Sequence, residues 1–133
     1  MKIHHIGYLV KKPDRALKAF KDLGYVTVRE TVFDEFRGVD ITFVAKEGYL
    51  VELISPKTPD SVVSGLSKKM GNSPYHICYE TDDFDADIER LRLSGYVIWQ
   101  EPAPACAIDG KRVCFLVHPY MGIIELLDTG DKT

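Results

Sequence analysis

The chain has 133 residues, a length that supports one domain with a core large enough to be stable without disulfides. Its formal net charge of −3 and its scattered lysine and arginine residues exclude the dense positive surface of a nucleic-acid-binding protein. No apolar run approaches the roughly 20 residues that cross a bilayer, and the N-terminus carries no signal-peptide pattern, so we expect a cytoplasmic protein without a membrane partner.

The first part of the chain predicts a strand, a helix and three further strands. Residues 3–10 have the alternation of a strand. Asp14 is the expected N-cap of a helix whose apolar face ends at Gly24. Three strand candidates follow at about 25–32, 38–46 and 49–55, and Glu47-Gly48 is the expected hairpin turn between the last two. This order is βαβββ.

Residues 57–74 are rich in Ser, Lys, Pro and Gly and are expected to link two modules. Asp60-Ser61 is a candidate cap for a short helix that runs through Met70. Two interpretations of this segment stay open, a solvated linker and a mobile cover over a ligand.

The last part of the chain repeats the same order of elements. A strand is expected near 75–81 and a helix from about Asp85 to Ser94, and three strands are expected near 96–100, 112–117 and 122–127. Pro102 to Lys111 is expected to be a loop that turns at Asp109-Gly110.

Three features of the first part recur in the second, which predicts an internal repeat. His5 and His76 are 71 residues apart, as are Gly24 and Gly95, whereas Glu52 and Glu125 are 73 apart. We expect a short insertion in the 102–111 loop to supply the two extra residues. The prediction is an α+β fold in a single domain, residues 1–133, of two paired βαβββ modules at about 1–56 and 75–128.

The repeated histidines and glutamates are candidates for a metal centre. Each glutamate lies in an apolar strand, where an unpaired carboxylate costs several kcal/mol and needs a cation, strong donors or a raised pKa. Singly, each side chain has a structural interpretation, the histidines as core hydrogen-bonding residues and the glutamates as ion-paired ones. Because equivalent positions of paired modules meet near one axis, we predict a mixed N/O site for Ni, Co, Zn, Mn or Fe, with a structural charge cluster as the alternative.

Other polar residues are weaker candidates. His4 alternates to the face opposite His5, Cys78 shares the face of His76, and His118 is expected to serve a loop. With three cysteines and no C-x-x-C pair, we expect reduced thiols. The residues that could meet an anionic substrate, or lie solvated at the surface, are Arg37, Lys57, Lys111 and Arg112.

Four motifs, H-I-G-Y-L-V, V-E-L-I-S-P, Y-H-I-C-Y-E and G-I-I-E-L-L, resemble those of the vicinal oxygen chelate superfamily. This superfamily includes glyoxalase I, methylmalonyl-CoA epimerase, fosfomycin-resistance proteins, extradiol dioxygenases and bleomycin-binding proteins. The resemblance covers essentially the whole chain. It implies that His5, Glu52, His76 and Glu125 are the ligands of one divalent ion.

The ligand set resembles that of glyoxalase I, because many epimerases carry Gln at the position of Glu52. Dioxygenases use two histidines and one glutamate, and bleomycin-binding members lack the ligands. Leu9 and Pro56, however, replace an Arg and an Asn of bacterial glyoxalase I enzymes, which argues against glutathione. A second catalytic Glu of epimerases falls on Phe36, one residue from Glu35, yet V-E-L-I-S-P and R-V-C-F-L-V-H-P resemble epimerase sequences.

By resemblance, the leading prediction is a divalent-metal-dependent lyase or isomerase of the glyoxalase I (lactoylglutathione lyase) type, which removes a proton next to a carbonyl through a metal-bound enediolate. Glu125 is the predicted base and Glu52 a ligand with a reciprocal catalytic role. The alternative is a methylmalonyl-CoA epimerase, and a further alternative is a non-catalytic small-molecule-binding or resistance protein. The expected partners are a thiol adduct or an acyl-CoA and a second copy of the chain in a homodimer.

Overall fold

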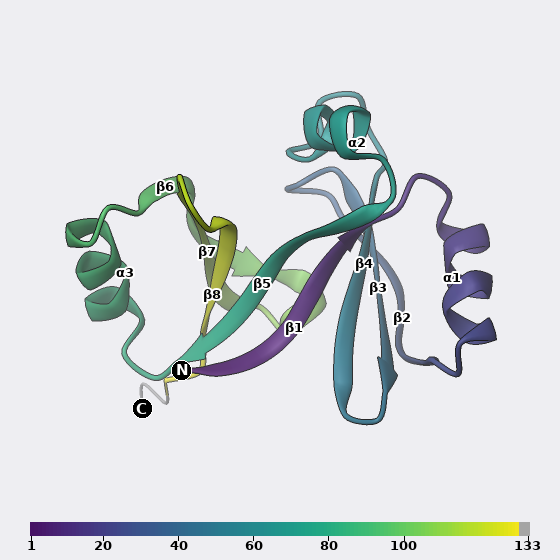
Figure 1. Cartoon of the computed structure of the whole chain (residues 1–133), viewed down its shortest axis with the longest axis horizontal. Helices are drawn as coiled ribbons and strands as arrows, with labels where there is room; N and C mark the ends of the chain where they lie inside the picture. The colour runs from purple at the N-terminus through teal and green to yellow at the C-terminus, as the bar shows by residue number, and fades with distance from the viewer. Residues whose placement is uncertain (131–133) are drawn as a thin grey trace. The chain divides into compact units, whose positions relative to one another are not determined.

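The computed structural model describes residues 1–130, which form two compact units (Figure 1). The first unit comprises residues 5–75. The second comprises Met1–His4 and residues 76–130. Each unit contains one four-stranded mixed sheet and one long helix, so the predicted α+β class and the βαβββ order of each module are confirmed.

The sheet of the first unit has the strand order β2-β3-β4-β1. β1 (Lys2–Leu9) runs parallel to β4 (Tyr49–Pro56), whereas β2 (Val26–Asp34) and β3 (Val39–Lys46) join by antiparallel pairing. Helix α1 (Pro13–Asp22) covers one face, where Leu17 and Phe20 pack on the buried side chains of Val10, Val44, Val51 and Leu53. The polar candidates of β1 and β4 therefore lie on the other face.

The helix termini only partly follow the prediction. The Asp14 cap is wrong, because α1 begins at Pro13 after Lys12 and has no side-chain cap. Proline suits the first helical position, since its missing N–H has no partner there in any helix. The linker helix α2 (Ser64–Met70) begins after Val63 rather than at Asp60-Ser61. The predicted turn at Glu47-Gly48 is confirmed, with φ values of 51° and 84°.

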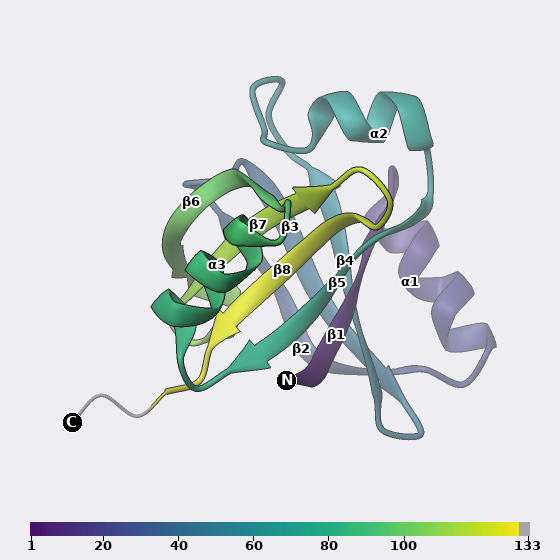
Figure 2. The same cartoon turned by 60° about the vertical axis from the view of Figure 1, so that its left-hand side comes forward.

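The sheet of the second unit has the order β5-β8-β7-β6. β5 (Ser73–Thr81) is parallel to β8 (Gly122–Asp128), and β7 (Lys111–His118) pairs antiparallel with β8 and with β6 (Val97–Ala105). Helix α3 (Phe84–Leu93) lies across one face (Figure 2), with Ile88 and Leu91 packed on a core that includes Leu116, Ile124 and Leu126.

The repeat extends to the irregularities of the two edge strands. The register of β2 shifts on both sides of Arg29, and that of β6 shifts on both sides of Gln100, which lies 71 residues later. β6 continues to Ala105, so the predicted loop from Pro102 is wrong over its first part. A short 3₁₀ turn η1 (Cys106–Ile108) and a bend at Asp109-Gly110 complete the connection.

The two extra residues of the second module lie in two places, not in one. The β6–β7 connection has five residues (106–110), whereas the β2–β3 connection has four (35–38). The β7–β8 turn has three residues (119–121), whereas the β3–β4 turn has two (47–48). The separation between equivalent residues of the two modules is therefore 71 up to the third strand, 72 in the third strand and 73 in the fourth.

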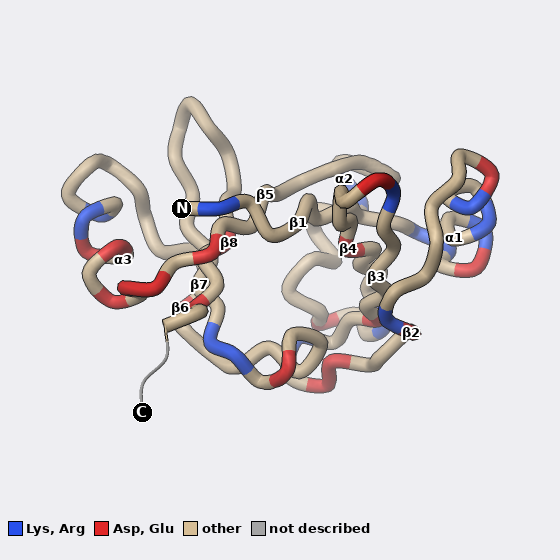
Figure 3. The backbone as a smooth tube through the Cα atoms, turned by 90° about the horizontal axis from the view of Figure 1, so that it is seen from below, with Lys and Arg blue, Asp and Glu red and all other residues tan. Residues whose placement is uncertain are grey.

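In the backbone trace of Figure 3, α1 carries acidic residues near both ends with basic residues between them, whereas the acidic residues of α3 precede its basic ones. Within residues 1–130, no helix combines the length and the apolar character that a membrane crossing demands. This agrees with the absence of a long apolar run in the sequence.

Candidate functional site

In the first unit, His5 and Glu52 lie together on the sheet face opposite α1. Tyr8 of β1 and Val10, which follows the strand, face the core under α1. His5 lies at alternate positions with Gly7 and Leu9 and therefore projects to the other side. Glu52 pairs in register with Gly7 across the parallel strands. The His5 Nε2 and Glu52 Oε1 atoms are 3.4 Å apart, and the two side chains are 0% and 5% exposed.

In the second unit, His76 and Glu125 form the equivalent pair. Glu125 on β8 lies in register with Cys78 on β5, two residues after His76 on the same face. The His76 Nε2 and Glu125 Oε1 atoms are 3.0 Å apart, with side chains 0% and 4% exposed. The predicted position of Cys78 beside this pair is confirmed, and its thiol is fully buried.

An aromatic ring stands beside each histidine, which the sequence analysis missed. Phe43 meets His5 edge to face with ring centres 5.4 Å apart, and Phe115 meets His76 in the same way at 5.2 Å. Each phenylalanine is also the cross-strand neighbour of the glutamate of its pair. The two phenylalanines are 72 residues apart, an offset that matches the internal repeat, and this spacing could have identified them in the sequence. Both rings are buried with the pairs, and electrostatic interactions are stronger in such a low-dielectric environment.

The geometry of each pair fits two ligands of one metal ion. Ligand atoms about 2.1 Å from a divalent ion lie about 3.0 Å apart at neighbouring octahedral positions and about 3.4 Å apart at tetrahedral ones. The pairs of Nε2 and Oε1 atoms are 3.0 and 3.4 Å apart. Imidazole nitrogen and carboxylate oxygen also suit Ni, Co, Zn, Mn and Fe. That both pairs bind a single ion stays a prediction.

Three of the four cationic substrate candidates form ion pairs within their own units. Arg37 bonds the buried Asp34, with Nη1 2.8 Å from Oδ2, and Lys57 Nζ lies 3.2 Å from Asp40 Oδ2. Lys111, the fourth, is exposed. None of the three paired side chains depends on a substrate anion for a charge partner.

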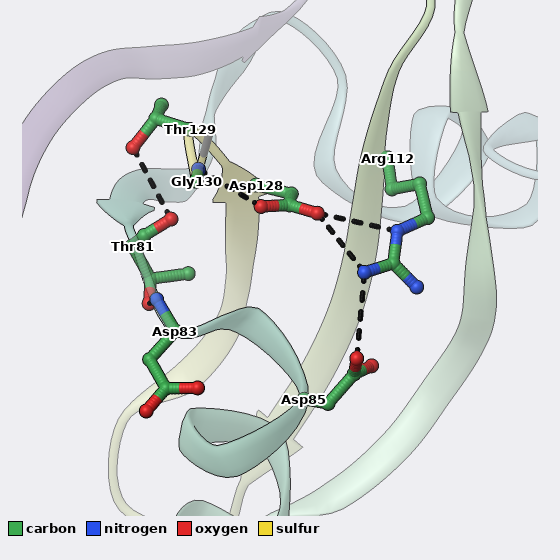
Figure 4. Close-up of polar contacts among 7 residues, drawn as sticks. All are labelled: Thr81, Asp83, Asp85, Arg112, Asp128, Thr129 and Gly130. Atoms are coloured by element: carbon green, nitrogen blue, oxygen red, sulfur yellow. Dashed lines mark hydrogen bonds and ion pairs between the residues drawn. The ribbon is translucent and has the colours of Figure 1, made fainter. Parts of the chain in front are cut away.

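Arg112 lies on the helix-covered face of the second unit, where Figure 4 shows its guanidinium between two carboxylates. Its Nη2 atom is 3.0 Å from Asp128 Oδ2 and 3.5 Å from Asp85 Oδ2, and its guanidinium stacks over the ring of Phe84. The hydrogen bond to Asp128 raises the pKa of Arg112. Arg112 therefore fastens α3 to β7 and β8.

The two remaining histidines are His118 and His4. His118 accepts a hydrogen bond at Nδ1 from the backbone N–H of Tyr120, 3.1 Å away, so its predicted loop role is confirmed. His4 is half-buried and belongs to the second unit, while its neighbour His5 belongs to the first.

The turn between β2 and β3 exposes two further side chains. Glu35 and Phe36 are both exposed, and Phe36 retains 75% of its accessible surface. The flanking Asp34 and Arg37 are 3% and 9% exposed. Glu35 is thus a solvent-facing carboxylate on a turn whose ends are buried.

Residues 4–115 match a family model described as the Glyoxalase/Bleomycin resistance protein/Dioxygenase superfamily. The matched range contains the strands that carry His5, Glu52 and His76.

Characterised relatives of the chain are epimerases. The ethylmalonyl-CoA/methylmalonyl-CoA epimerase of Cereibacter sphaeroides is 27% identical over 119 residues, which are 89% of this chain and 88% of that protein. The mitochondrial methylmalonyl-CoA epimerase of Homo sapiens is 29% identical over 119 residues, 89% of this chain and 66% of that protein.

A solved structure of the Streptomyces coelicolor methylmalonyl-CoA epimerase, in complex with 2-nitronate-propionyl-CoA, has the same fold. It superposes with a TM-score of 0.81 at 26% identity and covers 98% of this chain and 99% of that chain.

Proposed function

The chain belongs to the Glyoxalase/Bleomycin resistance protein/Dioxygenase superfamily, and from this premise we propose that it is an acyl-CoA epimerase. The substrate class is a thioester that carries a free carboxylate on its α-carbon, as in methylmalonyl-CoA. The observation that carries the proposal is a buried His–Glu pair repeated in both units of a chain whose relatives are epimerases. The comparisons favour this alternative over the leading prediction of a glyoxalase I type.

We propose that His5, Glu52, His76 and Glu125 together hold one divalent ion, with Ni, Co or Zn preferred and Mn or Fe as alternatives. When bound, the ion would stabilise negative charge that develops on a carbonyl oxygen of the substrate. The support is the donor chemistry of each pair and the spacing of its ligand atoms.

The reaction needs a base on one side of the α-carbon and an acid on the other. Glu125 is the proposed base: its carboxylate takes the α-proton, and the electron pair of the broken C–H bond delocalises into the thioester. A carboxylic acid on the opposite side then delivers a proton to the same carbon, which forms the new C–H bond with inverted configuration. The reaction balances without a further reactant.

Glu35 is our candidate for the second acid. Solved variants of the Streptomyces coelicolor epimerase change a glutamate and a glutamine that lie 17 residues apart. Glu35 also precedes Glu52 by 17 residues, and Glu52 occupies the position where many epimerases carry Gln. This spacing favours Glu35 over the Phe36 position indicated by the sequence pattern.

The test follows the α-proton of methylmalonyl-CoA by NMR in D₂O, with the purified protein loaded with Ni, Co or Zn. We expect exchange and inversion of configuration with the wild-type protein and no turnover with Glu125→Gln. Absence of both exchange and inversion with the wild-type protein would refute the epimerase proposal.

Two parallel measurements separate the rival functions. A glutathione hemithioacetal tests for activity of the glyoxalase I type, which a glutamate rather than a glutamine at position 52 favours. Conversion of the hemithioacetal but not of methylmalonyl-CoA would support the glyoxalase I function. Elemental analysis tests the non-catalytic binding protein, which predicts no stoichiometric divalent ion. His76→Ala should lower metal affinity by at least about 100-fold, because it removes a direct ligand; unchanged occupancy would exclude His76 from the site.

A further inference from the structure

The turn that carries Glu35 is closed by a buried ion pair within it. Asp34 Oδ1 accepts a hydrogen bond from the backbone N–H of Arg37 at 3.0 Å, and Asp34 Oδ2 accepts one from Arg37 Nη1 at 2.8 Å. The Gly38 N–H also donates to the Asp34 carbonyl at 2.8 Å. One aspartate thus fixes both the backbone and the side chain of Arg37.

The same turn is bonded to the linker that follows β4. The carbonyl of Gly38 accepts the N–H of Lys57 at 2.8 Å, and the carbonyl of Arg37 accepts the N–H of Val62 at 3.2 Å. Gly38 has a φ of +68°, and a β-carbon there would collide with the hydroxyl of Thr58 and lie 3.2 Å from the Cα atom of Ser61. The close packing explains why a glycine ends the turn.

Arg37 also contacts the exposed tip of the turn. Its guanidinium carbon lies 5.3 Å from the centre of the Phe36 ring. A cation over an aromatic face is attracted to it, so Phe36 is held although 75% of its surface is exposed. The neighbouring Glu35 is therefore presented from a turn that is fixed on both sides.

We propose that Arg37 and Asp34 are positioning residues for the acid–base carboxylate of Glu35, and that residues 57–62 of the linker stabilise this position. The inference rests on the proposed function, since it assigns Glu35 a role in proton transfer. It assigns a supporting role to these two residues and to part of the linker, in addition to the residues proposed to touch the substrate or the ion.

The physical reason is the geometric demand of proton transfer. An acid must lie within hydrogen-bond reach of the carbon it protonates, and a misplacement of about 1 Å can cost about 100-fold in rate. A carboxylate on an ordinary exposed turn samples many positions. The Asp34–Arg37 pair and the linker bonds reduce that freedom before the substrate binds.

A displaced Glu35 has an isotopic signature that general unfolding does not produce. With Glu125 intact, the enantiomer whose α-proton faces Glu125 still exchanges that proton with solvent and recovers its own configuration. Inversion requires the second acid and is lost. The ratio of exchange to inversion for that enantiomer therefore rises when Glu35 is misplaced.

The experiment measures this ratio for each methylmalonyl-CoA enantiomer with metal-loaded Arg37→Gln, Asp34→Asn and Glu35→Gln. We expect inversion to fall by about 100-fold in all three, while exchange of one enantiomer stays within about threefold of the wild-type rate. Arg37→Lys, which keeps one charged donor to Asp34, should recover part of the inversion. Arg112→Gln is the matched control, an ion-paired arginine of the other unit, and should leave the ratio unchanged.

We call the turn at residues 34–38, with its hydrogen bonds to Lys57 and Val62, the clamp. Amide hydrogen exchange on the same variants tests whether it opens. Arg37→Gln should increase exchange at Gly38, Lys57 and Val62 and leave the β4 amides protected. If Glu35→Gln raises the exchange-to-inversion ratio and Arg37→Gln leaves it unchanged, the positioning role of Arg37 would be refuted. The acid–base role of Glu35 would stand. A wild-type protein that neither exchanges nor inverts the substrate would remove the proposed function as well.

Discussion

The two units carry the same buried His–Glu pair and the same aromatic neighbour, but they differ in the turn between their second and third strands. In the first unit this turn, residues 35–38, is closed by the buried ion pair between Asp34 and Arg37 and is bonded to the linker. In the second unit the turn has five residues and begins with η1, and a β-carbon on Gly110 would meet no atom within 4 Å. The repeated halves therefore share their buried ligand candidates and differ in the length and the packing of this turn.

The largest expected difference is between the two buried glutamates. Glu125→Gln should lower turnover by at least about 1,000-fold, because an amide cannot accept the α-proton. Glu52→Gln should lower it by less than about tenfold, since an amide oxygen can replace a carboxylate as a ligand. Steady-state kinetics at saturating metal measure both. Equal losses in the two variants would return Glu52 to the reciprocal catalytic role predicted from the sequence.

The next comparison is between two ion-paired arginines. Arg37→Gln leaves the buried Asp34 without its charged partner and should lower the free energy of unfolding by about 3–5 kcal/mol. Arg112→Gln should change it little, because the Arg112 side chain is 38% exposed and solvent screens its ion pairs. Urea denaturation of both variants measures the difference. Similar values would show that the turn of the first unit is no more constrained than the surface.

A pair of glycines tests the packing of the two turns directly. Gly38 and Gly110 both have positive φ values, +68° and +75°, so alanine should cost about 1–2 kcal/mol at either position. Gly38→Ala should cost more than Gly110→Ala, because only its β-carbon would collide with Thr58 and Ser61. Thermal unfolding measures the two costs, and a larger loss in Gly110→Ala would contradict the clamp.

The smallest effect concerns the thiols. Burial, with a lesser contribution from Glu101, raises the pKa of Cys114 to about 12. The thiol is neutral below that value, so at pH 8 only about one molecule in 10,000 carries the reactive thiolate there. Cys106 is exposed and Cys78 is buried. Iodoacetamide should label Cys106 first, and mass spectrometry that finds rapid labelling of Cys114 would contradict its burial.

The sequence predicted the repeat and the buried pairs because these depend on short-range periodicity. His5 and Glu52 lie in strands whose alternation fixes the face of each side chain, and a constant offset identifies their equivalents. Phe43 was missed for a different reason, since a phenylalanine in an apolar strand is ordinary until its cross-strand neighbour is known.

The clamp at residues 34–38 could not be predicted in the same way. Its closure depends on contacts with residues 57–62, about 20 positions along the chain, and no local pattern encodes them. The predicted cap of α1 was wrong for a local reason. Pro13 and Asp14 are both favourable near a helix start, and the helix begins at the proline. The split of the two-residue difference between two turns likewise required the strand register.

The parallel pairing of β1 with β4 has a kinetic consequence. Ile6 and Val51 are register partners 45 residues apart, whereas β2, β3 and β4 join through short connections. Closing the longer loop costs more chain entropy, so the β2-β3-β4 meander should form before β1 docks onto it. Glu52 lies on β4, which belongs to the meander, whereas His5 is brought into place by β1. The His5–Glu52 pair therefore forms only when the parallel pairing of β1 with β4 completes the sheet of the first unit. The rate of metal binding during refolding, measured by stopped flow, should then report the final folding step.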